Sequence, residues 1–446
     1  MRQQRTVQAS LFDVFAGHEI GRQLKATSLW IDAHPELVAR VAGDLRRCEV
    51  KDTGRQGLTA ESVLRCALLK QHRQLSYEEL AFHLEDSASF RAFARLAGSG
   101  APKKSGLHST ISAIRAETWE AINRVVIESA RRGKVEPGDV IRVDSTVTAA
   151  LMHEPSDSSL LWDAVRVMAR LLKAAQALAG DGKIVWRDRR RAAKMRAYAI
   201  QYTRGRPGRV QHYRALIKIV RAMLADLEAA QIKLEPAANP MAEVWRAALA
   251  HYRPLIGQVL AQTERRVFGG QSVAAGEKIV SLFEPHADII RKGGRDVEYG
   301  HKINLTSGKS GLILDVVIEA GNPADSDRFL PMLERHIAAY GRAPRQAVAD
   351  GGYASGANLQ QAKALGVRDM AFHKKVGLRI EDMVRSRWVY RKLRNFRAGI
   401  EAGISCLKRA YGLSRCTWRG LDHFRAYVWS SVVAYNLTLL ARLKPS

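Results

Sequence analysis

One acidic residue of the sequence lies inside an otherwise apolar, strand-like segment. Asp144 stands between Val143 and Ser145 in the run DVIRVDSTVTAAL, where Val and Thr recur with the alternation of a β-strand. An ionised carboxylate in such a segment is costly unless it pairs with a cation or binds a metal ion. Taken alone, such a residue is more often a turn former or a salt-bridge partner than a catalytic group.

A second carboxylate ends another short apolar segment. Asp350 closes the run RQAVAD and is followed by Gly351 and Gly352. Glycines at this place allow a backbone or a ligand to approach closely. A carboxylate at a strand end beside a glycine turn suits an active site on an α/β sheet.

The third candidate belongs to a predicted helix, FRAGIEAGISCLKRAYG. Glu401 has Arg397 four residues before it and Lys408 seven residues after it. At 3.6 residues per turn, these three side chains lie within roughly 60° of one another around the helix axis. The alternative is a row of ordinary surface ion pairs, but Ile400, Ile404 and Leu407 on the same helix indicate that one face is buried.

Together these carboxylates predict metal-ion chemistry. Two Asp from neighbouring strands and one Glu from a helix can hold two divalent cations about 3.5–4 Å apart. Carboxylate and water ligands favour Mg²⁺ or Mn²⁺ over zinc. The matching reaction is in-line attack on a phosphodiester. Asp163, Asp296 and Glu298 are weaker candidates, because none stands in a comparable motif.

The charge of the chain points to a polyanionic partner. Its 446 residues contain 71 Lys and Arg against 44 Asp and Glu, a formal net charge of +27. This excess favours nucleic acid and disfavours an acidic linker protein or an enzyme of small cations. The four cysteines are too few and too scattered for a disulfide framework or a zinc site: Cys48, Cys66, Cys406 and Cys416.

No targeting or membrane segment is expected. The N-terminal run MRQQRTVQASLFDVF lacks the apolar stretch of a signal peptide. The most apolar late segment, residues 427–440, is too short to span a bilayer and contains Ser430, Ser431 and Asn436. We therefore expect a cytoplasmic, nucleoid-associated protein with no membrane partner.

Two stretches concentrate the basic residues. Residues 187–221 contain twelve Lys or Arg and one acid, Asp188, and residues 374–419 contain thirteen against three acids. The first stretch includes the loop TRGRPGR and several tyrosines, a composition typical of contacts with DNA phosphates or a minor groove. A solvated surface is the plainer interpretation of such runs. The predicted DNA-binding residues here are Arg189, Arg190, Arg191, Arg204 and Arg206.

The elements around these residues predict an α/β fold. Residues 20–130 show helical spacing, with a capping box at Ser76 and Glu79 and a basic loop at residues 103–105 before a helix over 110–132. This resembles a helix-turn-helix-like DNA-binding module, and a helical dimerisation or packing domain is the alternative. A strand follows at residues 139–151, then a helical tract over 158–265. The segments KIVSLF, EYGHKINL and GLILDVVIEAG are predicted strands, followed by a helix over 326–340, the strand RQAVAD and a helical tail over 381–444.

The helical tract must therefore interrupt a mixed sheet, as an insertion after its first strand. The predicted domains are a helical N-terminal DNA-binding or dimerisation domain (1–135), the first part of the catalytic domain (136–155), a basic helical insertion (156–275), and the rest of the catalytic domain with C-terminal helices (276–446).

These motifs resemble those of a known enzyme family. RVDSTVT, AVADGGYAS and the helix with Arg397, Glu401 and Lys408 are similar to the three catalytic motifs of bacterial insertion-sequence DDE transposases. The spacing Arg-x3-Glu-x6-Lys matches the end of the Tyr-x2-Arg-x3-Glu-x6-Lys pattern of one large group. LSYEELAFHLEDSASFRAF resembles the helical domain before the catalytic core in that group, and HEPSDSSLLWDAVR resembles the segment after the first Asp. The likeness covers most of the chain except the middle helical block.

The resemblance implies an RNase H-like catalytic domain in which Asp144, Asp350 and Glu401 bind Mg²⁺, with Mn²⁺ as a substitute. It implies that Arg397 and Lys408 contact phosphates near the cleaved bond. Double-stranded DNA, as transposon ends and as target, would be the partner, and a homodimer or larger synaptic complex would join the ends. The alternatives are a DNA-binding protein with an inactive transposase fold and an RNase H-like nuclease without strand transfer.

The sequence departs from the pattern of the group at two places. Arg394 stands where the Tyr is expected, and Tyr390 is out of register. The second departure is the place of the insertion. It follows the first strand instead of lying just before the helix of Glu401, where the interval from Asp350 is too short to contain it. The first departure puts tyrosine-dependent positioning of DNA in doubt and does not affect the three carboxylates.

Overall fold

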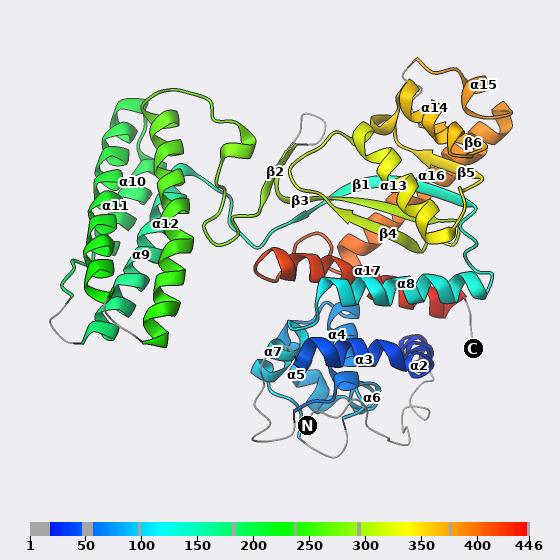
Figure 1. Cartoon of the computed structure of the whole chain (residues 1–446), viewed down its shortest axis with the longest axis horizontal. Coiled ribbons are helices and arrows are strands. Elements are labelled where there is room, and N and C mark those ends of the chain that lie inside the picture. The colour runs from blue at the N-terminus through cyan, green and yellow to red at the C-terminus, as the bar shows by residue number, and fades with distance from the viewer. Residues whose placement is uncertain are drawn as a thin grey trace. The chain divides into compact units, whose positions relative to one another are not determined.

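The chain forms two compact units in the computed structural model (Figure 1). Unit 1 comprises Met1–Leu151 and His301–Ser446, and unit 2 comprises Met152–Gly300. The structure describes residues 18–46, 57–96, 100–180, 184–235, 239–291, 296–373 and 377–443. Cys48 lies outside these residues, whereas Cys66, Cys406 and Cys416 carry free thiols.

Only helices precede the first strand in the described part of the chain. They are α2 (Glu19–Asp32), α3 (Pro35–Arg46), α4 (Ala60–His72), α5 (Tyr77–Asp86), α6 (Ala88–Phe93), α7 (Lys104–Ile111) and α8 (Ala116–Arg132). The predicted capping box is confirmed: Ser76 accepts from the Glu79 amide, and Glu79 accepts from the Ser76 amide. Thr59 caps α4 in the same way through the Ser62 amide.

The predicted loop and helix between residues 103 and 132 are wrong in detail. α7 already begins at Lys104, and the region predicted as one helix over 110–132 forms two, because α7 ends at Ile111 and α8 begins at Ala116. The break follows from a distant contact, because the buried Asp44 of α3 accepts a hydrogen bond from the Arg115 amide at the start of α8. A sequence pattern around residue 115 carries no sign of that partner.

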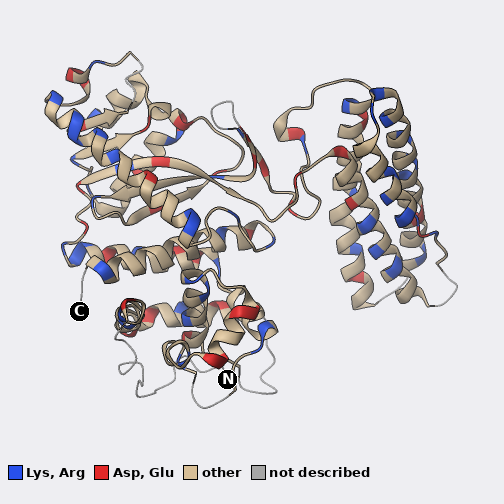
Figure 2. Ribbon diagram, turned by 180° about the vertical axis from the view of Figure 1, so that it is seen from behind, with Lys and Arg blue, Asp and Glu red and all other residues tan. Residues whose placement is uncertain are grey.

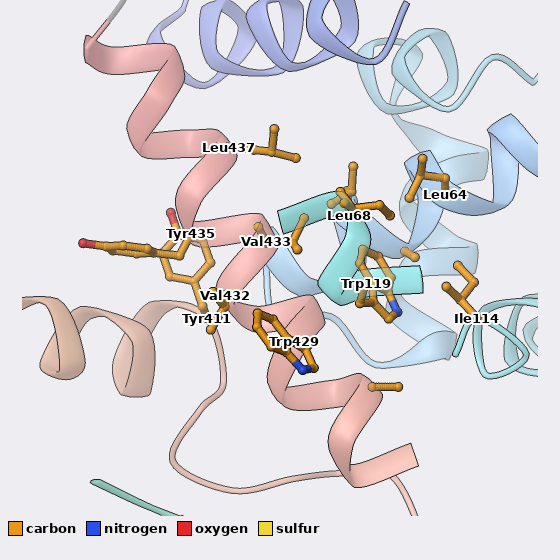
Figure 3. Close-up of a cluster of buried hydrophobic side chains, with 14 of the residues drawn as sticks. Leu64, Leu68, Ile114, Trp119, Tyr411, Trp429, Val432, Val433, Tyr435 and Leu437 are labelled. Carbon is orange, nitrogen blue, oxygen red and sulfur yellow. The ribbon is translucent and has the colours of Figure 1, made fainter. Parts of the chain in front are cut away.

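These helices share one hydrophobic core with the end of the chain. α17 (Leu421–Leu443) lies alongside α8 and packs on α4 (Figure 1). Figure 3 shows Trp119 of α8 near Leu68 of α4 and Val433 of α17. Burial of apolar surface stabilises a folded protein by about 25 cal/mol per Å², so this extensive cluster contributes strongly to the stability of unit 1. The N-terminal helices therefore belong to the same compact unit as the sheet that α17 supports.

The sheet is mixed and has the order β2-β3-β1-β5-β6, with β4 also paired to β3. Its strands are β1 (Val140–Ala149), β2 (Asp288–Arg291), β3 (Val297–Gly308), β4 (Ile313–Ile318), β5 (Gln346–Ala349) and β6 (Asp369–Phe372). β1, β5 and β6 are parallel neighbours, and β3 is antiparallel to β2 and β4. The predicted mixed α/β architecture, with helices inserted between its first and second strands, is thereby confirmed.

Register between the parallel strands places two of the candidate carboxylates side by side. Val143 of β1 pairs with Ala349 of β5. The next residues are Asp144 and Asp350. Asp350 directly follows the carboxyl end of β5, and Asp144 lies beside it in the middle of β1, where the β1–β5 ladder ends; the carboxyl ends of parallel strands are where α/β sheets bind ligands.

Helices cover the sheet between and after the later strands. They are α13 (Asp325–Tyr340), α14 (Gly356–Ala364), α15 (Ile380–Met383) and α16 (Arg387–Ala410), with the short 3-10 helix η2 (Gly351–Tyr353); a further 3-10 helix, η1 (Ala275–Glu277), precedes β2. α16 packs across β1, β5 and β6 (Figure 1). This helix carries Arg397 and Glu401 over the strands that carry the two aspartates.

One strand prediction is wrong and two strands were not predicted. KIVSLF is not a strand, because the side chain of Gln262 accepts from the Ile279 amide at 2.9 Å and donates to the Ile279 carbonyl at 3.0 Å. A buried side chain thus satisfies the backbone groups that a neighbouring strand would take. β2 and β6 each have only four residues.

Unit 2 is a bundle of helices with its own core. Its helices are α9 (Asp157–Ala179), α10 (Arg190–Tyr202), α11 (Arg206–Leu234) and α12 (Pro240–Val267), which pack around a separate apolar cluster. Lys and Arg are spread along these helices (Figure 2). No described helix in either unit is long and apolar enough to cross a membrane.

A buried arginine fixes α16 on the sheet. Arg142 lies two residues before Asp144 in β1, so both side chains leave the same face of the strand. Its guanidinium donates to the Phe396 carbonyl at 2.8 Å and lies over the Phe396 ring. Gly399 leaves room for it, since a Cβ at that position would come within 2.1 Å of Arg142 Nη1.

We therefore predict that Gly399→Ala destabilises the protein by about 1–3 kcal/mol, because the added methyl group overlaps the held guanidinium. Gly403→Ala, one turn further along α16, is the control. Its nearest neighbour is the Tyr435 hydroxyl at 3.5 Å, so the helix preference for Ala leaves it as stable as the parent or up to about 1 kcal/mol more stable. The measurement is the free energy of unfolding in urea, and equal values for the two variants would contradict the role of Gly399.

Candidate active site

Three carboxylates of unit 1 meet at one guanidinium. Nη2 of Arg397 lies 3.7 Å from Oδ2 of Asp144 and 3.2 Å from Oδ1 of Asp350. Nη1 of the same side chain donates to Oε1 of Glu401 at 2.9 Å. The structure thus brings together all three carboxylates that the sequence singled out, with Arg397 between them.

Exposure rises in order across this cluster. The side chain of Arg397 is 8% exposed and that of Asp144 is 14% exposed, whereas Asp350 and Glu401 are 42% and 59% exposed. Asp144 therefore forms the floor of the site, and the other two carboxylates border the solvent. The buried Nε of Arg397 has no hydrogen-bond partner among the described residues.

The backbone fixes the two aspartates in different ways. Asp144 continues β1 and accepts from the amide of Ser145 at 2.7 Å. Asp350 follows β5 and precedes η2, which turns the chain immediately after the strand. Asp350 is thereby held at the strand end and remains accessible.

A fourth carboxylate supports the site from below. Asp325, the first residue of α13, accepts from the Ser145 hydroxyl at 3.0 Å and pairs with Lys302 of β3 at 2.6 Å. Lys302 is buried and also donates to the Pro323 carbonyl. A Cβ on Gly352 would lie 3.0 Å from Asp325, so the glycine turn after Asp350 rests closely on this pair.

A second polar chain runs beneath η2. The hydroxyl of Tyr353 donates to Oδ1 of Asn304 at 2.9 Å, and the amide of Asn304 donates to Glu319 at 2.6 Å. Burial, with a smaller effect from nearby Asp325, raises the pKa of Tyr353. The phenol therefore stays protonated and keeps its role as a hydrogen-bond donor.

Sequence reasoning missed Asp325 and Lys302. Asp325 has the pattern of an ordinary acidic residue in the first turn of a helix. Lys302 could have been noticed as a charge inside the apolar run EYGHKINL, since a buried lysine needs a carboxylate partner.

The remaining predicted residues lie outside the carboxylate cluster. Lys408, in the last turn of α16, is partly exposed, and Arg394 lies over the Tyr390 ring. In unit 2, Arg189 pairs with Asp226 and Arg190 pairs with Asp188. Arg191, Arg204 and Arg206 are exposed and have no ion-pair partner among the residues described. Asp163, a weaker candidate, is occupied by His153 and Arg166.

The oxygens of the three carboxylates are suitable ligands for a divalent cation, although all three carboxylates contact Arg397 in this structure. Carboxylate oxygens are the ligands that Mg²⁺ and Mn²⁺ prefer, and like charges this close need a compensating cation. As the side chains stand, the described residues contain no group of three His, Cys, Asp or Glu ready to hold a metal ion. The Arg397 guanidinium contacts both aspartates and supplies the positive charge instead.

We predict that Asp325→Asn lowers the free energy of unfolding by about 2–3 kcal/mol, because it leaves the buried Lys302 without its counter-charge. Glu78→Gln is the matched control: it breaks the exposed pair with Lys104 and should cost less than about 1 kcal/mol. Both values come from urea denaturation. An Asp325→Asn protein as stable as the Glu78→Gln protein would rule out a structural role for the Lys302 pair.

Comparisons with known proteins add an independent observation. Residues 280–437 match a family model described as Transposase DDE domain, and residues 23–117 match one described as Transposase domain (DUF772). Asp350, Arg397, Glu401 and Lys408 lie inside the first match, whereas Asp144 and most of unit 2 lie between the two. Neither the curated proteins nor the solved structures gave a match.

A DDE transposase domain implies an RNase H-like fold, and the mixed sheet with its parallel β1, β5 and β6 is consistent with it. Two separate matches of the same kind, in the order expected along the chain, support an insertion-sequence transposase. Residues 280–437, which contain Asp350 and Glu401, are thus similar to a DDE transposase domain, and residues 23–117 are similar to a second transposase domain.

Proposed function

We propose that this protein binds the ends of its own insertion sequence and catalyses cleavage and strand transfer of DNA there. One observation carries the proposal: the β1–β5 register and the packing of α16 bring Asp144, Asp350 and Glu401 to a single point at a sheet edge. Three carboxylates gathered in this way form the donor set of a two-metal phosphodiester site.

Asp144, Asp350 and Glu401 are the residues that would hold Mg²⁺, with Mn²⁺ as a substitute. When bound, the metal ions would activate a water or 3′-hydroxyl nucleophile and stabilise the leaving oxygen. β1 holds Asp144 fixed, while the exposed Glu401 side chain is able to adjust. Arg397, beside the three carboxylates, and Lys408, further along α16, would contact phosphate oxygens of the DNA.

The DNA-binding part of the proposal rests on charge. The net charge of +27 favours a long polyanion, and we assign Arg189, Arg190, Arg191, Arg204 and Arg206 of unit 2 to the grip on the transposon end. The N-terminal helices would serve DNA binding or dimerisation. A homodimer or larger synaptic complex would hold two ends together, because both must be joined in one event.

We place the chain in the group with the Tyr-x2-Arg-x3-Glu-x6-Lys pattern, with Arg394 at the tyrosine position. We also retain, as a division by function, the four segments predicted from the sequence: 1–135, 136–155, 156–275 and 276–446. In this division the insertion over 156–275 serves to hold DNA, and the parts on either side of it form the catalytic domain.

The decisive test uses purified protein, Mg²⁺ and a DNA fragment carrying the ends that flank its coding sequence. We predict cleavage at the ends and joining to a target, both abolished by chelation and reduced at least about 10³-fold in Asp350→Asn and Glu401→Gln, because each substitution removes a metal-binding oxygen. Asp422→Asn removes a carboxylate that is almost fully exposed and should retain full activity. Products are measured on denaturing gels.

Three outcomes would contradict the proposal in different ways. End binding without cleavage by the parent protein would favour a DNA-binding protein with an inactive fold. Cleavage without joining would favour a nuclease. Unchanged cleavage in both Asp350→Asn and Glu401→Gln would place the active site elsewhere.

A further inference from the structure

A second polar site lies in unit 2, at one end of its helical bundle. The start of α11, the end of α12 and the turn after α12 line an open surface pocket of about 420 Å³. Its polar walls are Arg206 and Arg209 of α11 and Arg266 of α12, and the ring of Tyr213 closes one side. Three arginine side chains therefore line one pocket.

No acidic side chain lines this pocket. Neither Arg206 nor Arg209 forms an ion pair with any acidic residue that the structure describes, although Nε of Arg209 donates to the Thr203 carbonyl at 2.9 Å. Only Arg266 is paired, through Nη1, to Asp157 at 2.9 Å. Two of the three guanidinium groups thus have most of their donors available to a ligand.

The pocket differs from the other arginines of the basic stretch. Arg189 and Arg190 already pair with Asp226 and Asp188, as surface arginines usually do. Gly270, which has a positive φ of 62°, forms the wall opposite Arg206, and a Cβ there would lie 3.7 Å from Arg206 Nη2. The left-handed backbone favours glycine at this position, so the wall carries no side chain into the space before Arg206.

We propose that this pocket binds one phosphate group of the DNA backbone through Arg206, Arg209 and Arg266. Planar guanidinium groups recognise phosphate by paired N–H···O bonds, and three arginines around one concave site favour a localised phosphate contact over a diffuse run of them. This inference rests on the proposed function for its occupant, a DNA end. It adds Arg209 and Arg266 to the residues that contact DNA, and it assigns a single phosphate-binding site to the insertion.

The test combines two measurements on the full chain. In the first, phosphates of the end DNA are ethylated at random, and the positions that block binding are mapped. We expect the Arg206→Gln/Arg209→Gln protein to lose interference at one or two adjacent phosphates, with a fall of about 1–2 in the slope of log K against log salt. The control, Lys173→Gln/Lys218→Gln, removes the same charge from exposed sites of the same unit and should keep every position of interference.

The second measurement follows modification of arginines by phenylglyoxal, read by mass spectrometry. End DNA should protect Arg206 and Arg209 at micromolar concentration, whereas inorganic phosphate should protect them only at millimolar concentration. Protection by inorganic phosphate but not by DNA would reject the DNA backbone as occupant and assign the pocket to a free phosphate.

If the double variant loses affinity for DNA but keeps an unchanged interference map, the proposal would also be overturned. Arg206 and Arg209 would then attract DNA through their charge without contacting one particular phosphate. These outcomes are separable from failure of the proposed function. Protected arginines and a changed map in a protein that never cleaves its ends would leave the pocket standing and remove the transposase activity.

Discussion

Repulsion among three carboxylates is the constraint on which the rest of unit 1 depends. Asp144, Asp350 and Glu401 converge on a place that is partly closed to solvent, where negative charges of one sign interact strongly. Arg397 offsets that repulsion by contacting all three. The guanidinium thus supplies the positive charge that a divalent cation would otherwise supply. The three carboxylates can therefore come together before any substrate binds.

This convergence requires that a helix and two strands be held in register. Arg142 lies on the same face of β1 as Asp144. Its hydrogen bond to the carbonyl of Phe396, the residue directly before Arg397, fixes α16 on the strand. On the other side, the pair of Asp325 with Lys302 supports Ser145 and the glycine turn after Asp350. The three carboxylates are therefore positioned by the buried Arg142 and by the pair of Asp325 with the buried Lys302.

Much of this arrangement follows from local patterns. Alternation around Asp144, the glycines after Asp350 and the helical spacing of Arg397 and Glu401 predicted both the elements and the faces they present. What could not be predicted depends on partners distant in sequence: Gln262 taking the backbone bonds of Ile279, and Asp44 capping α8. The contacts of Arg397 with the aspartates belong to the same class, because a helical wheel shows its neighbours on the helix and not the strands beneath.

The position of unit 2 within the chain has a consequence for synthesis. β1 must pair with β5, yet about two hundred residues separate Val140 from Gln346. At roughly 5–20 residues per second, the ribosome needs about 10–40 s to supply that partner. During this time β1 has an unpaired edge, which is prone to wrong association. Unit 2 has a core of its own and can fold in the interval. The segment between β1 and β5 is then a compact unit and not a long flexible loop when β1, which carries Asp144, pairs with β5.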